Sequence, residues 1–481
     1  MISIMSIITI IVFKEESMSS KEKDIHLSFV KSMSILLFLL VAIYFAVVRW
    51  QMDPQIPIVL TTVYGAALAM FSGISWQRLE EAILDNINTV AQSLLVLLVI
   101  GIMLGTWLHS GVVPTMIYYG SLIISPKLFL PTACLLCSIT SLSTGDSWGT
   151  AGTVGIALMG IGLSFGIPAP MIAGAVVSGS YFGDKMSPMS DTTLLASAVA
   201  KADLFEHIKY MLWTTIPALI IAVVAYFFIG LPHAHNVNVD EIQVMLGELS
   251  SAVNINPILL LAPAFVIAMI ALKIPALPAL MMGTLIGSVF AVIFQGATLP
   301  EVMDAMHYGI SMETGNELID SLVSGGGLDY VMWTISLIFC AMALGGILDG
   351  SGAIKEVVSR MMKRINSVGK LVTTTIFTSF FINFAMADQY LAIIFPGKMF
   401  GEEYEKMGLH PKVLSRTLED AGTLTSPLFP WNTCGAFIMS VLMVNPFAYA
   451  PYAILNWVAP IISIIYSFTG FKIAYIDNGK N

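Results

Sequence analysis

The residues best suited to bind a small ion lie in polar strings that interrupt apolar sequence. One string, GDKMSPMSDTT at 183–193, follows the apolar run PMIAGAVVSGSYF and precedes LLASAVA. It contains two carboxylates, Asp184 and Asp191, and the hydroxyls of Ser187 and Thr192. Carboxylate, hydroxyl and freed backbone carbonyl oxygens are the ligands that a small hard cation such as Na⁺ prefers. This string therefore predicts one wall of a site for an ion or a small polar substrate.

A second string in the same half of the chain offers the same chemistry. SLSTGDSWGTAGTVG at 141–155 contains Asp146, with Thr144 and Ser147 on either side of the Gly-Asp pair. Asp146 has no basic neighbour in the sequence and lies deep in an apolar region. A carboxylate at such a depth normally faces a cavity, a partner or an ion. We therefore predict that Asp146 contacts the ion, together with Thr144 and Ser147.

The second half of the chain contains two corresponding strings, NFAMADQY at 383–390 and EDAGTLTSPLFPWNT at 419–433. The candidate ion-contacting or substrate-contacting residues in them are Asn383, Asp388, Gln389, Thr425, Ser426, Asn432 and Thr433. Asp388 occupies the place that corresponds to Asp146 in the first half. Glycines and prolines in the strings break helices and free backbone carbonyls for binding. We therefore expect a site with a wall from each half of the chain.

Some of these charges also have a simpler structural explanation, which stays open at this point. Asp184 precedes Lys185 and could pair with it, or it could cap a short helix. Asp191 begins an apolar run and fits the pattern of a helix N-cap. The acidic pair at 419–420 follows Arg416 and fits an ion pair at the surface.

The composition predicts an α-helical membrane protein. Of the 481 residues, 57% are hydrophobic and 11% are charged, whereas soluble domains contain roughly 25% charged residues. The apolar runs are continuous and about 20 residues long, which favours spanning helices over a β-barrel. No basic cluster indicates a nucleic-acid groove. Cys134 and Cys137 have no further cysteines or histidines nearby, so we interpret them as helix-packing residues.

Eight membrane spans are predicted from the apolar runs. They are 31–50, 56–74, 91–109, 210–230, 257–273, 276–295, 331–349 and 452–471. Two further stretches, 128–200 and 371–445, are apolar but contain the polar strings, so hairpins or broken helices are expected there. Segments 75–90 and 300–320 are interpreted as amphipathic or interfacial.

The distribution of Lys and Arg predicts the orientation in the membrane. The basic residues Lys355, Arg360, Lys363, Arg364 and Lys370 assign the loop 350–370 to the cytoplasm, and Lys21, Lys23 and Lys31 assign the N-terminus there. Loops 231–256 and 296–330 contain no Lys or Arg and are expected outside. The predicted division of the chain is a cytoplasmic extension at 1–30, a transmembrane repeat at 31–230, an external loop at 231–256, an inverted repeat at 257–471 and a cytoplasmic tail at 472–481. Met18 is an alternative translation start to Met1.

The spans of the two halves correspond in order but run in opposite directions. LGTWLHSGVV at 104–113 and LGGILDGSGAI at 344–354 are locally alike, and each precedes a broken region. Inverted halves with interrupted helices at matching positions are typical of secondary transporters. The predicted fold class is an all-α polytopic membrane protein with two inverted-topology repeats and broken or re-entrant helices.

The polar strings also resemble a known family. GTAGTVG at 149–155, GSYFGDKMSPMSDTTLLAS at 179–197 and LEDAGTLTSPLFPWNTCGAF at 418–437 resemble the NhaC family of Na⁺/H⁺ antiporters, and the similarity covers most of the chain. The resemblance implies gradient-driven exchange of Na⁺ for H⁺ across a bacterial inner membrane, in a larger ion-transporter group with hairpins that stop within the membrane. The family includes members similar to Na⁺-coupled malate/lactate exchangers.

We therefore hypothesise a secondary active transporter that exchanges Na⁺ for H⁺ by alternating access. Asp146 and Asp388, or one of them with Asp184, would bind either Na⁺ or a proton, and never both together. Malate or lactate exchange, coupled to Na⁺ and H⁺, stays open as the alternative. A channel is a further alternative, distinguished by the absence of stoichiometric coupling.

The remaining expectations concern partners and location. No Walker A pattern or HExxH motif is present, so we expect no ATP, no cofactor and no enzymatic activity. The expected partners are Na⁺, H⁺ and the lipid bilayer, without nucleic acid, and a homodimer is left open. The expected location is the inner cell membrane, with several spans and with both termini in the cytoplasm.

Overall fold

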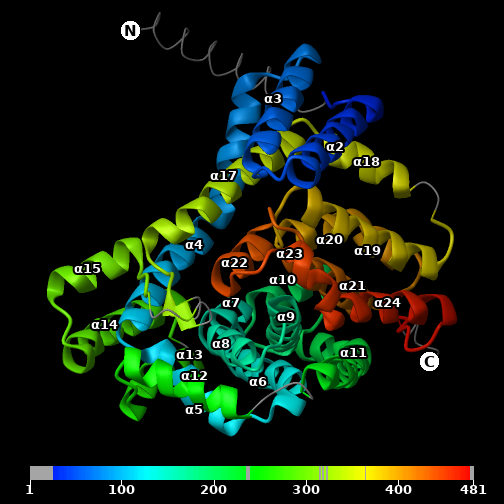
Figure 1. Ribbon diagram of the computed structural model, residues 1–481. Coiled ribbons are helices and arrows are strands. Elements are labelled where there is room, and N and C mark those ends of the chain that lie inside the picture. Colours follow the sequence, from blue (N-terminus) through cyan, green and yellow to red (C-terminus); the bar gives the residue numbers. More distant parts are fainter. Residues whose placement is uncertain are drawn as a thin grey trace, which may run out of the picture. The chain divides into compact units, whose positions relative to one another are not determined.

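The computed structural model describes residues 25–234, 239–272, 274–313, 316, 319–320, 323–362 and 365–476 (Figure 1). Within these residues the regular secondary structure is all helical, and the β-type pairing consists of two isolated β-bridges, Ile310–Gly325 and Leu409–Tyr475. The predicted all-α class of a polytopic membrane protein is confirmed. Met1, Met18, Lys21, Lys23, Lys363 and Arg364, on which predictions of translation start and orientation rest, lie outside the described residues.

Seven described helices are long and apolar enough to cross a membrane, or up to nine if each of two bent pairs counts as one span. The seven are α2 (Phe29–Ile43) with the π-helical η1 (Tyr44–Arg49), α4 (Trp76–His109), η2 (Pro126–Leu128) with α6 (Phe129–Thr144), α11 (Leu204–Ala234), α14 (Ala276–Gln295), α17 (Leu328–Gly350) and α19 (Val368–Ala385). Each combines continuous apolar sequence with the length that a bilayer requires.

The bent pairs and the shorter helices complete the apolar elements. The bent pairs are α12 (Val239–Ala252) with η4 (Pro257–Leu260) and α13 (Leu261–Ala271), at 91°, and α22 (Thr433–Leu442) with α23 (Pro446–Tyr449) and η7 (Ala450–Tyr452), at 87°. The shorter apolar helices are α3 (Gln55–Phe71), α5 (Val112–Ile123) and α24 (Ile454–Thr469). A proline begins the second part of each bent pair, where a missing N–H is tolerated.

The predicted spans fall on apolar helices, although those at 56–74, 257–273 and 452–471 coincide with shorter helices or with one part of a bent pair, and three other segments differ in extent. The span predicted at 91–109 is the second part of α4, and the segment 75–90 belongs to the same 34-residue helix. A helix of that length is about 51 Å long, which exceeds the roughly 30 Å of a hydrocarbon core. The external loop predicted at 231–256 contains the helix α12. In the segment 300–320, α15 (Leu299–Tyr308) is a short helix that starts with a Thr298–Glu301 capping box.

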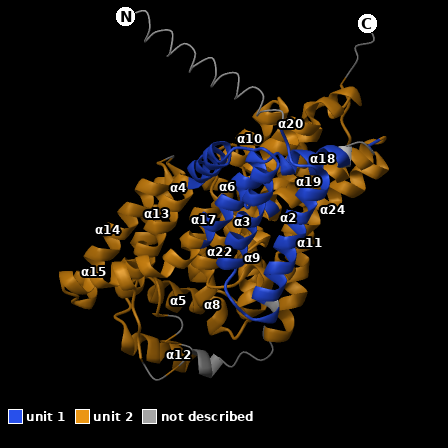
Figure 2. Ribbon diagram, turned by 90° about the horizontal axis from the view of Figure 1, so that it is seen from above, with its two compact units in different colours: residues 1–90, 337–365, 385–387 blue, residues 91–336, 366–384, 388–481 orange. Residues whose placement is uncertain are grey.

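The chain divides into two compact units, and each draws on both halves of the sequence (Figure 2). Unit 1 comprises residues 1–90, 337–365 and 385–387, and unit 2 comprises the rest. In unit 1, Gly65 of α3 lies against Ile347 of α17, and Lys31 of α2 donates to the Ser72 hydroxyl at 2.7 Å. The helix α18 (Ala353–Met362) follows α17 in this unit.

In unit 2, α6 packs tightly against α9 (Ala169–Met186). Gly179 and Gly183 are one turn apart on α9, and a Cβ on Gly183 would clash with the backbone N of Leu142. Such small residues at this spacing let two helix backbones approach closely. The free cysteines Cys134 and Cys137 are buried in this contact, beside Gly179, as expected of packing residues.

Both predicted broken regions contain interrupted helices, two in each region. In the first, α6 ends before Gly145, whose φ of +71° favours glycine, and helix resumes as α7 (Ser147–Thr150), the π-helical η3 (Ala151–Gly155) and α8 (Ile156–Ser164). After α9, residues 187–190 precede α10 (Asp191–Ala200). In the second region, α19 and α20 (Leu391–Lys406) are separated by 386–390. The run of α21 (Pro411–Leu418), the π-helical η5 (Glu419–Thr423) and η6 (Ser426–Leu428) is likewise separated from α22.

The order of the interruptions is therefore the same in both regions, which agrees with the predicted repeats. Their inverted relation stays a prediction, as does the division at 31–230 and 257–471.

Candidate ion-binding site

Asp184 is the centre of a buried oxygen cluster formed by two helix interruptions of unit 2. It lies in the last turn of α9 with an exposed fraction of 4%. Its Oδ2 accepts a hydrogen bond from the Ser147 hydroxyl at 2.6 Å, and its Oδ1 accepts one from the Ser190 hydroxyl at 2.5 Å. Ser147 begins α7, and Ser190 immediately precedes α10, so the interruptions position both donors.

Ser190 is a residue that sequence reasoning left out of the predicted contacts. It is six residues from Asp184, across the interruption between α9 and α10, and no helical periodicity relates the two positions. The Ser-Pro-x-Ser pattern at 187–190 was the available signal, because serines beside a helix break often bind neighbouring polar groups. Ser187, which was predicted, instead accepts from the Met189 N–H at 3.3 Å and closes the local turn.

Asp146 lies at the interruption between α6 and α7. Its backbone is extended, with φ −139° and ψ 111°, and its Oδ1 accepts from the Trp148 N–H at 2.9 Å. It is therefore the N-cap of α7, and Thr144 accepts from the Asp146 N–H at 3.3 Å. Gly145 is in contact with Ser190, which holds this interruption against the one after α9.

GDSWG at 145–149 also fits the G-x-S-x-G pattern of hydrolase nucleophiles, a match that sequence reasoning overlooked. That motif requires a turn from a strand to a helix and a histidine that accepts the serine proton. Here the turn joins two helices, and Ser147 donates to Asp184. The pattern therefore does not indicate a hydrolase.

Asp191 is the third carboxylate of this group. It is exposed in the first turn of α10, and its Oδ2 accepts from the Tyr390 hydroxyl at 2.6 Å. Ser190, and not Asp191, is the N-cap of α10. Asp146, Asp184 and Asp191 interact electrostatically, so negative charge accumulates where the interruptions meet. Thr192 bonds to the Ser190 hydroxyl at 3.0 Å.

Asp388 lies at the matching interruption of the second half, between α19 and α20. It is fully buried, and its Oδ1 accepts from the Leu391 N–H at 2.9 Å. Its Oδ2 has no hydrogen-bond partner among the residues that the structure describes. Asp388 thus stands at the start of a helix as Asp146 does. The sequence comparison of the two halves predicted this correspondence.

The other candidates of the second half form one hydrogen-bonded network. Asn383 donates to the Gly422 carbonyl at 2.7 Å and to the Thr425 hydroxyl at 3.0 Å, and Asn432 donates to the Asn383 side-chain oxygen at 3.1 Å. Asn432 also caps α22. This part of the network joins α19, the segment after η5 and the start of α22.

Gln389 extends the same network. Its side-chain oxygen accepts from the Ser426 hydroxyl at 3.0 Å and from the Cys434 thiol at 2.6 Å. Thr433 is buried beside these residues at the first position of α22. Cys434 was not among the predicted contacts, because an isolated cysteine in an apolar stretch has no distinctive pattern.

Contacts between the first-half and second-half strings bring the two walls together. Trp148 of α7 stacks on Phe437 of α22, with ring centroids 4.0 Å apart and planes 13° from parallel. Tyr390 reaches Asp191 across the same boundary. The predicted association of the first-half strings with the second-half strings is therefore present in unit 2.

Two simpler interpretations of the charges are wrong. Asp184 does not pair with Lys185, because Lys185 forms a fully buried ion pair with Asp420. The acidic pair at 419–420 and Arg416 are not at the surface, because all three side chains are fully buried. Arg416 Nε lies 3.8 Å from Asp420 Oδ2. The sequence pattern alone could not distinguish a surface ion pair from a buried one.

The arrangement is suited to a small hard cation or a proton. A buried ionised carboxylate is costly unless donors or a cation compensate it, and adjacent carboxylates raise that cost. Ser147 and Ser190 each supply a hydroxyl that can donate to an empty carboxylate or turn a lone pair to a bound cation. Within the described ranges, no three His, Cys, Asp or Glu side chains are grouped so that they could hold a metal ion by themselves.

Comparison with known proteins places these features in a family. The sequence profile of the Na⁺/H⁺ antiporter family matches residues 179–471. The chain is 39% identical to the Na⁺/H⁺ antiporter NhaC of Alkalihalophilus pseudofirmus over 88% of this chain and 92% of that protein. It is 38% identical to NhaC of Bacillus subtilis over 94% and 99% of the two chains. It is also 35% identical to the malate-2H⁺/Na⁺-lactate antiporter of Bacillus subtilis over 95% and 98%. The chain therefore belongs to the NhaC-type Na⁺/H⁺ antiporter family of multi-pass membrane proteins.

Proposed function

We propose that this protein exchanges Na⁺ for H⁺ across the cell membrane, and that Asp184 with Ser147 and Ser190 binds the exchanged ion. The observation that carries the proposal is the buried Asp184 carboxylate, with each oxygen bound by a serine hydroxyl from a helix interruption. Interrupted helices at such a site are typical of secondary transporters. Asp146 and Asp191 add the negative potential that attracts a cation.

Competition for one site accounts for the exchange. Without a cation, burial favours the protonated form of a carboxyl group, and a bound Na⁺ replaces that proton. The negative charge of the carboxylate is then compensated in both forms, by H⁺ in one and by Na⁺ in the other. We assume that the protein exposes the site to the opposite side of the membrane only when the site holds Na⁺ or H⁺. Movement of Na⁺ in one direction then requires movement of H⁺ in the other. The chain itself supplies no energy in this scheme.

The other candidates have supporting roles in the proposal. Asp146 faces the same cluster and completes the Na⁺ shell from the α7 side, while Thr144 shapes its turn. Asp388 is the second-half counterpart, and the network of Asn383, Gln389 and Asn432 joins the neighbouring ends of α19 and α22. We place both termini and the loop 350–370 in the cytoplasm, and the protein in the inner membrane, as its basic residues indicate.

Organic-acid exchange is the second candidate, because one similar protein is named a malate-2H⁺/Na⁺-lactate antiporter. An organic carboxylate would bind to donors, and the amides of Asn383 and Asn432 beside the start of α22 could supply them by giving up the hydrogen bonds that they make within the network. In that case exchange would require malate or lactate as well as Na⁺.

Reconstituted transport tests both candidates. Proteoliposomes with an internal pH dye receive a Na⁺ gradient alone, then with malate, then with lactate. We expect Na⁺ alone to drive proton movement in the unmodified protein, and Asp184→Asn to abolish it. Asp203→Asn is the matched control, because Asp203 is an exposed N-cap of α11 and Asn serves equally there. Unchanged exchange in Asp184→Asn would refute the site, and a strict requirement for malate or lactate would favour the second candidate.

A further inference from the structure

Asp191 is an exposed carboxylate at the depth of the helix interruptions. It begins α10, whose 10 residues extend about 15 Å, roughly half the thickness of a hydrocarbon core. Lys201, the C-cap of α10, is exposed as well, as expected at the membrane surface. A carboxylate halfway across the membrane faces water and not lipid, because contact with lipid would be costly. Water therefore reaches Asp191 along α10.

The half-helices around Asp184 lead away from it in two directions. α7, η3 and α8 return along α9, because Ser147 binds Asp184 whereas Gly155 of η3 lies against Val176 of α9. α22 runs beside η3, and its Leu442 also lies against Gly155. These elements form the first group.

α10 and α20 form the second group. α10 continues from the end of α9 to the start of α11, and α11 then returns along α9, where Tyr226 bonds to the Ser178 hydroxyl at 2.7 Å. Val199 of α10 lies against Gly397 of α20, so these two helices run together. The C-cap of α10 and the last residue of α20 are both lysines, and basic residues indicate the cytoplasmic side.

A different contact joins the two halves of the chain in each group. In the first group, Trp148 stacks on Phe437 with ring centroids 4.0 Å apart, and Phe437 is fully buried. A dry aromatic contact opposes the passage of a hydrated cation. In the second group, the half-buried Tyr390 donates its hydroxyl to Asp191 Oδ2 at 2.6 Å. The polar approach to the site is therefore on the side of α10 and α20.

Oxygen atoms continue from Asp191 into the buried site. The Thr192 hydroxyl bonds to the Ser190 hydroxyl at 3.0 Å, and Ser190 donates to Asp184 Oδ1 at 2.5 Å. Asp191 and Asp184 also interact electrostatically. A cation at Asp191 can therefore exchange its water molecules for protein oxygens in steps on the way to Asp184.

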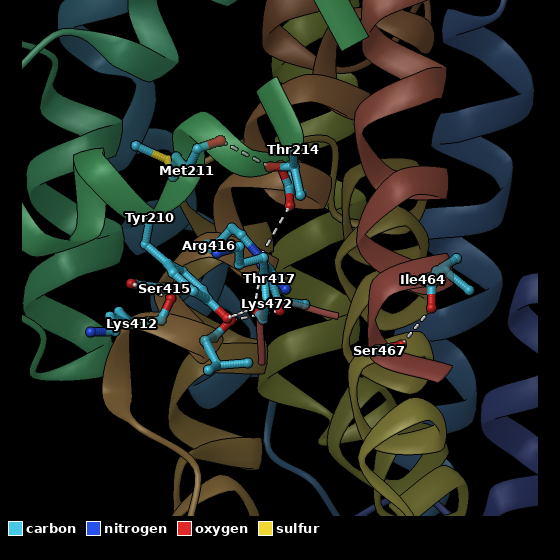
Figure 3. A network of polar contacts seen from close by, with 12 residues as sticks. Tyr210, Met211, Thr214, Lys412, Ser415, Arg416, Thr417, Ile464, Ser467 and Lys472 are labelled. Carbon is cyan, nitrogen blue, oxygen red and sulfur yellow. Dashed lines mark hydrogen bonds and ion pairs between the residues drawn. The ribbon is translucent and has the colours of Figure 1, made fainter. Parts of the chain in front are cut away.

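The buried cations nearby act on another carboxylate. Lys185 forms its ion pair with Asp420, and Arg416 also contacts Asp420. Figure 3 shows Arg416 next to Tyr210 and Thr214 of α11, and its guanidinium lies over the Tyr210 ring at 4.5 Å. The negative charge at Asp191 and Asp184 is therefore left to attract an incoming cation.

We propose that Asp191, held in place by Tyr390, is the point at which Na⁺ enters the site from the side on which α10 and α20 end. The inference rests on the proposed function of Asp184. Tyr390 is a positioning residue, because its hydroxyl fixes the Asp191 carboxylate beside Ser190. Asp191 raises the local concentration of Na⁺ through its charge, and because it is exposed, dissolved salt screens this effect.

The first test is the salt dependence of Asp191→Asn in proteoliposomes. At about 0.01 M choline chloride, the Na⁺ concentration for half-maximal proton movement should rise at least about threefold, with the rate at saturating Na⁺ within about twofold. At about 0.5 M the difference should fall below about twofold, because the Debye length shortens from about 30 Å to about 4 Å. Glu402→Gln is the matched control, because Glu402 is exposed on α20. A loss that does not depend on salt, or no loss at low salt, would overturn the inference.

The second test is a double-mutant cycle of Tyr390→Phe with Asp191→Asn. Phenylalanine keeps the ring and removes the hydroxyl, so Tyr390→Phe should raise the half-maximal Na⁺ concentration about twofold to fivefold. The double variant should match Asp191→Asn alone, because Tyr390 acts through that carboxylate. Tyr308→Phe, at an exposed position of α15, is the control. If the two losses multiplied, Tyr390 would have only a packing role and its assignment would be wrong.

The third test is the side from which water reaches Asp191. Asp191→Cys is treated with a membrane-impermeant cationic thiol reagent in everted and in right-side-out vesicles. Lys201→Cys marks the membrane face at which α10 ends, and the unmodified protein gives the background. Asp191→Cys should react faster from the face that Lys201→Cys reports, and faster reaction from the opposite face would overturn the direction of entry. Retained exchange in Asp184→Asn would instead refute the Na⁺ site itself, so the two failures are distinguishable.

Discussion

Replacement of Ser147 by alanine tests the core of the proposed Na⁺ site. The substitution removes the hydroxyl that binds Asp184 Oδ2 at 2.6 Å and leaves the carboxylate in place. When Na⁺ is bound, the same hydroxyl would turn a lone pair to the ion, and an interaction of this kind with a charged group contributes about 1.5–3 kcal/mol. Since each 1.4 kcal/mol corresponds to about a tenfold change in affinity, Ser147→Ala should weaken apparent Na⁺ binding by roughly 10-fold to 100-fold.

The assay is the Na⁺ concentration that gives half-maximal proton movement in proteoliposomes at one fixed pH. Ser143→Ala is the matched control, because Ser143 is exposed near the end of the preceding helix α6 and donates to the Ile139 carbonyl at 2.8 Å. That variant should match the unmodified protein. Ser190→Ala should resemble Ser147→Ala, since Ser190 binds the other oxygen of Asp184 at 2.5 Å. In the double variant, the loss of apparent Na⁺ affinity should be smaller than the sum of the losses in the two single variants, because both serines bind the same carboxylate. A half-maximal concentration within twofold of the control in both single variants would refute the assignment.

Two further predictions concern the scaffold of the site, and thermal unfolding of the purified protein in detergent measures both. Gly183→Ala should destabilise the protein by about 1–3 kcal/mol, as overpacking does, because the added Cβ meets the backbone of Leu142. Gly401→Ala is the control, since a Cβ there meets no atom within 4 Å, and an equal effect of both would contradict the close-packing argument. Lys185→Met should cost up to about 3–5 kcal/mol because it removes the nearer of the two buried cations that compensate Asp420 in the interior. Adding Asp420→Leu should restore part of that loss, and a further fall in the unfolding temperature would show that the pair is not the cause.

The amino-acid sequence by itself determined the elements that cross the membrane and the places where they are interrupted. The span at 276–295 has the same bounds in the structure, and α19 and α20 flank the predicted break at Asp388. These features are local consequences of solubility and backbone chemistry. About 20 continuous apolar residues suit a bilayer, and glycine, proline and capping side chains end helices wherever they occur.

The tertiary structure alone decided which polar groups meet. Asp184 binds Ser147, 37 residues earlier, and its neighbour Lys185 binds Asp420, 235 residues later. Asp184 and Lys185 are adjacent on one helix turn but belong to different clusters, whereas the sequence suggested that they pair with each other. The burial of Arg416 and Glu419 was likewise invisible, because charged residues near one another in sequence look the same at a surface and in an interior. Partners and depth depend on helix packing between distant segments, and that packing follows from contacts such as Gly183 against Leu142.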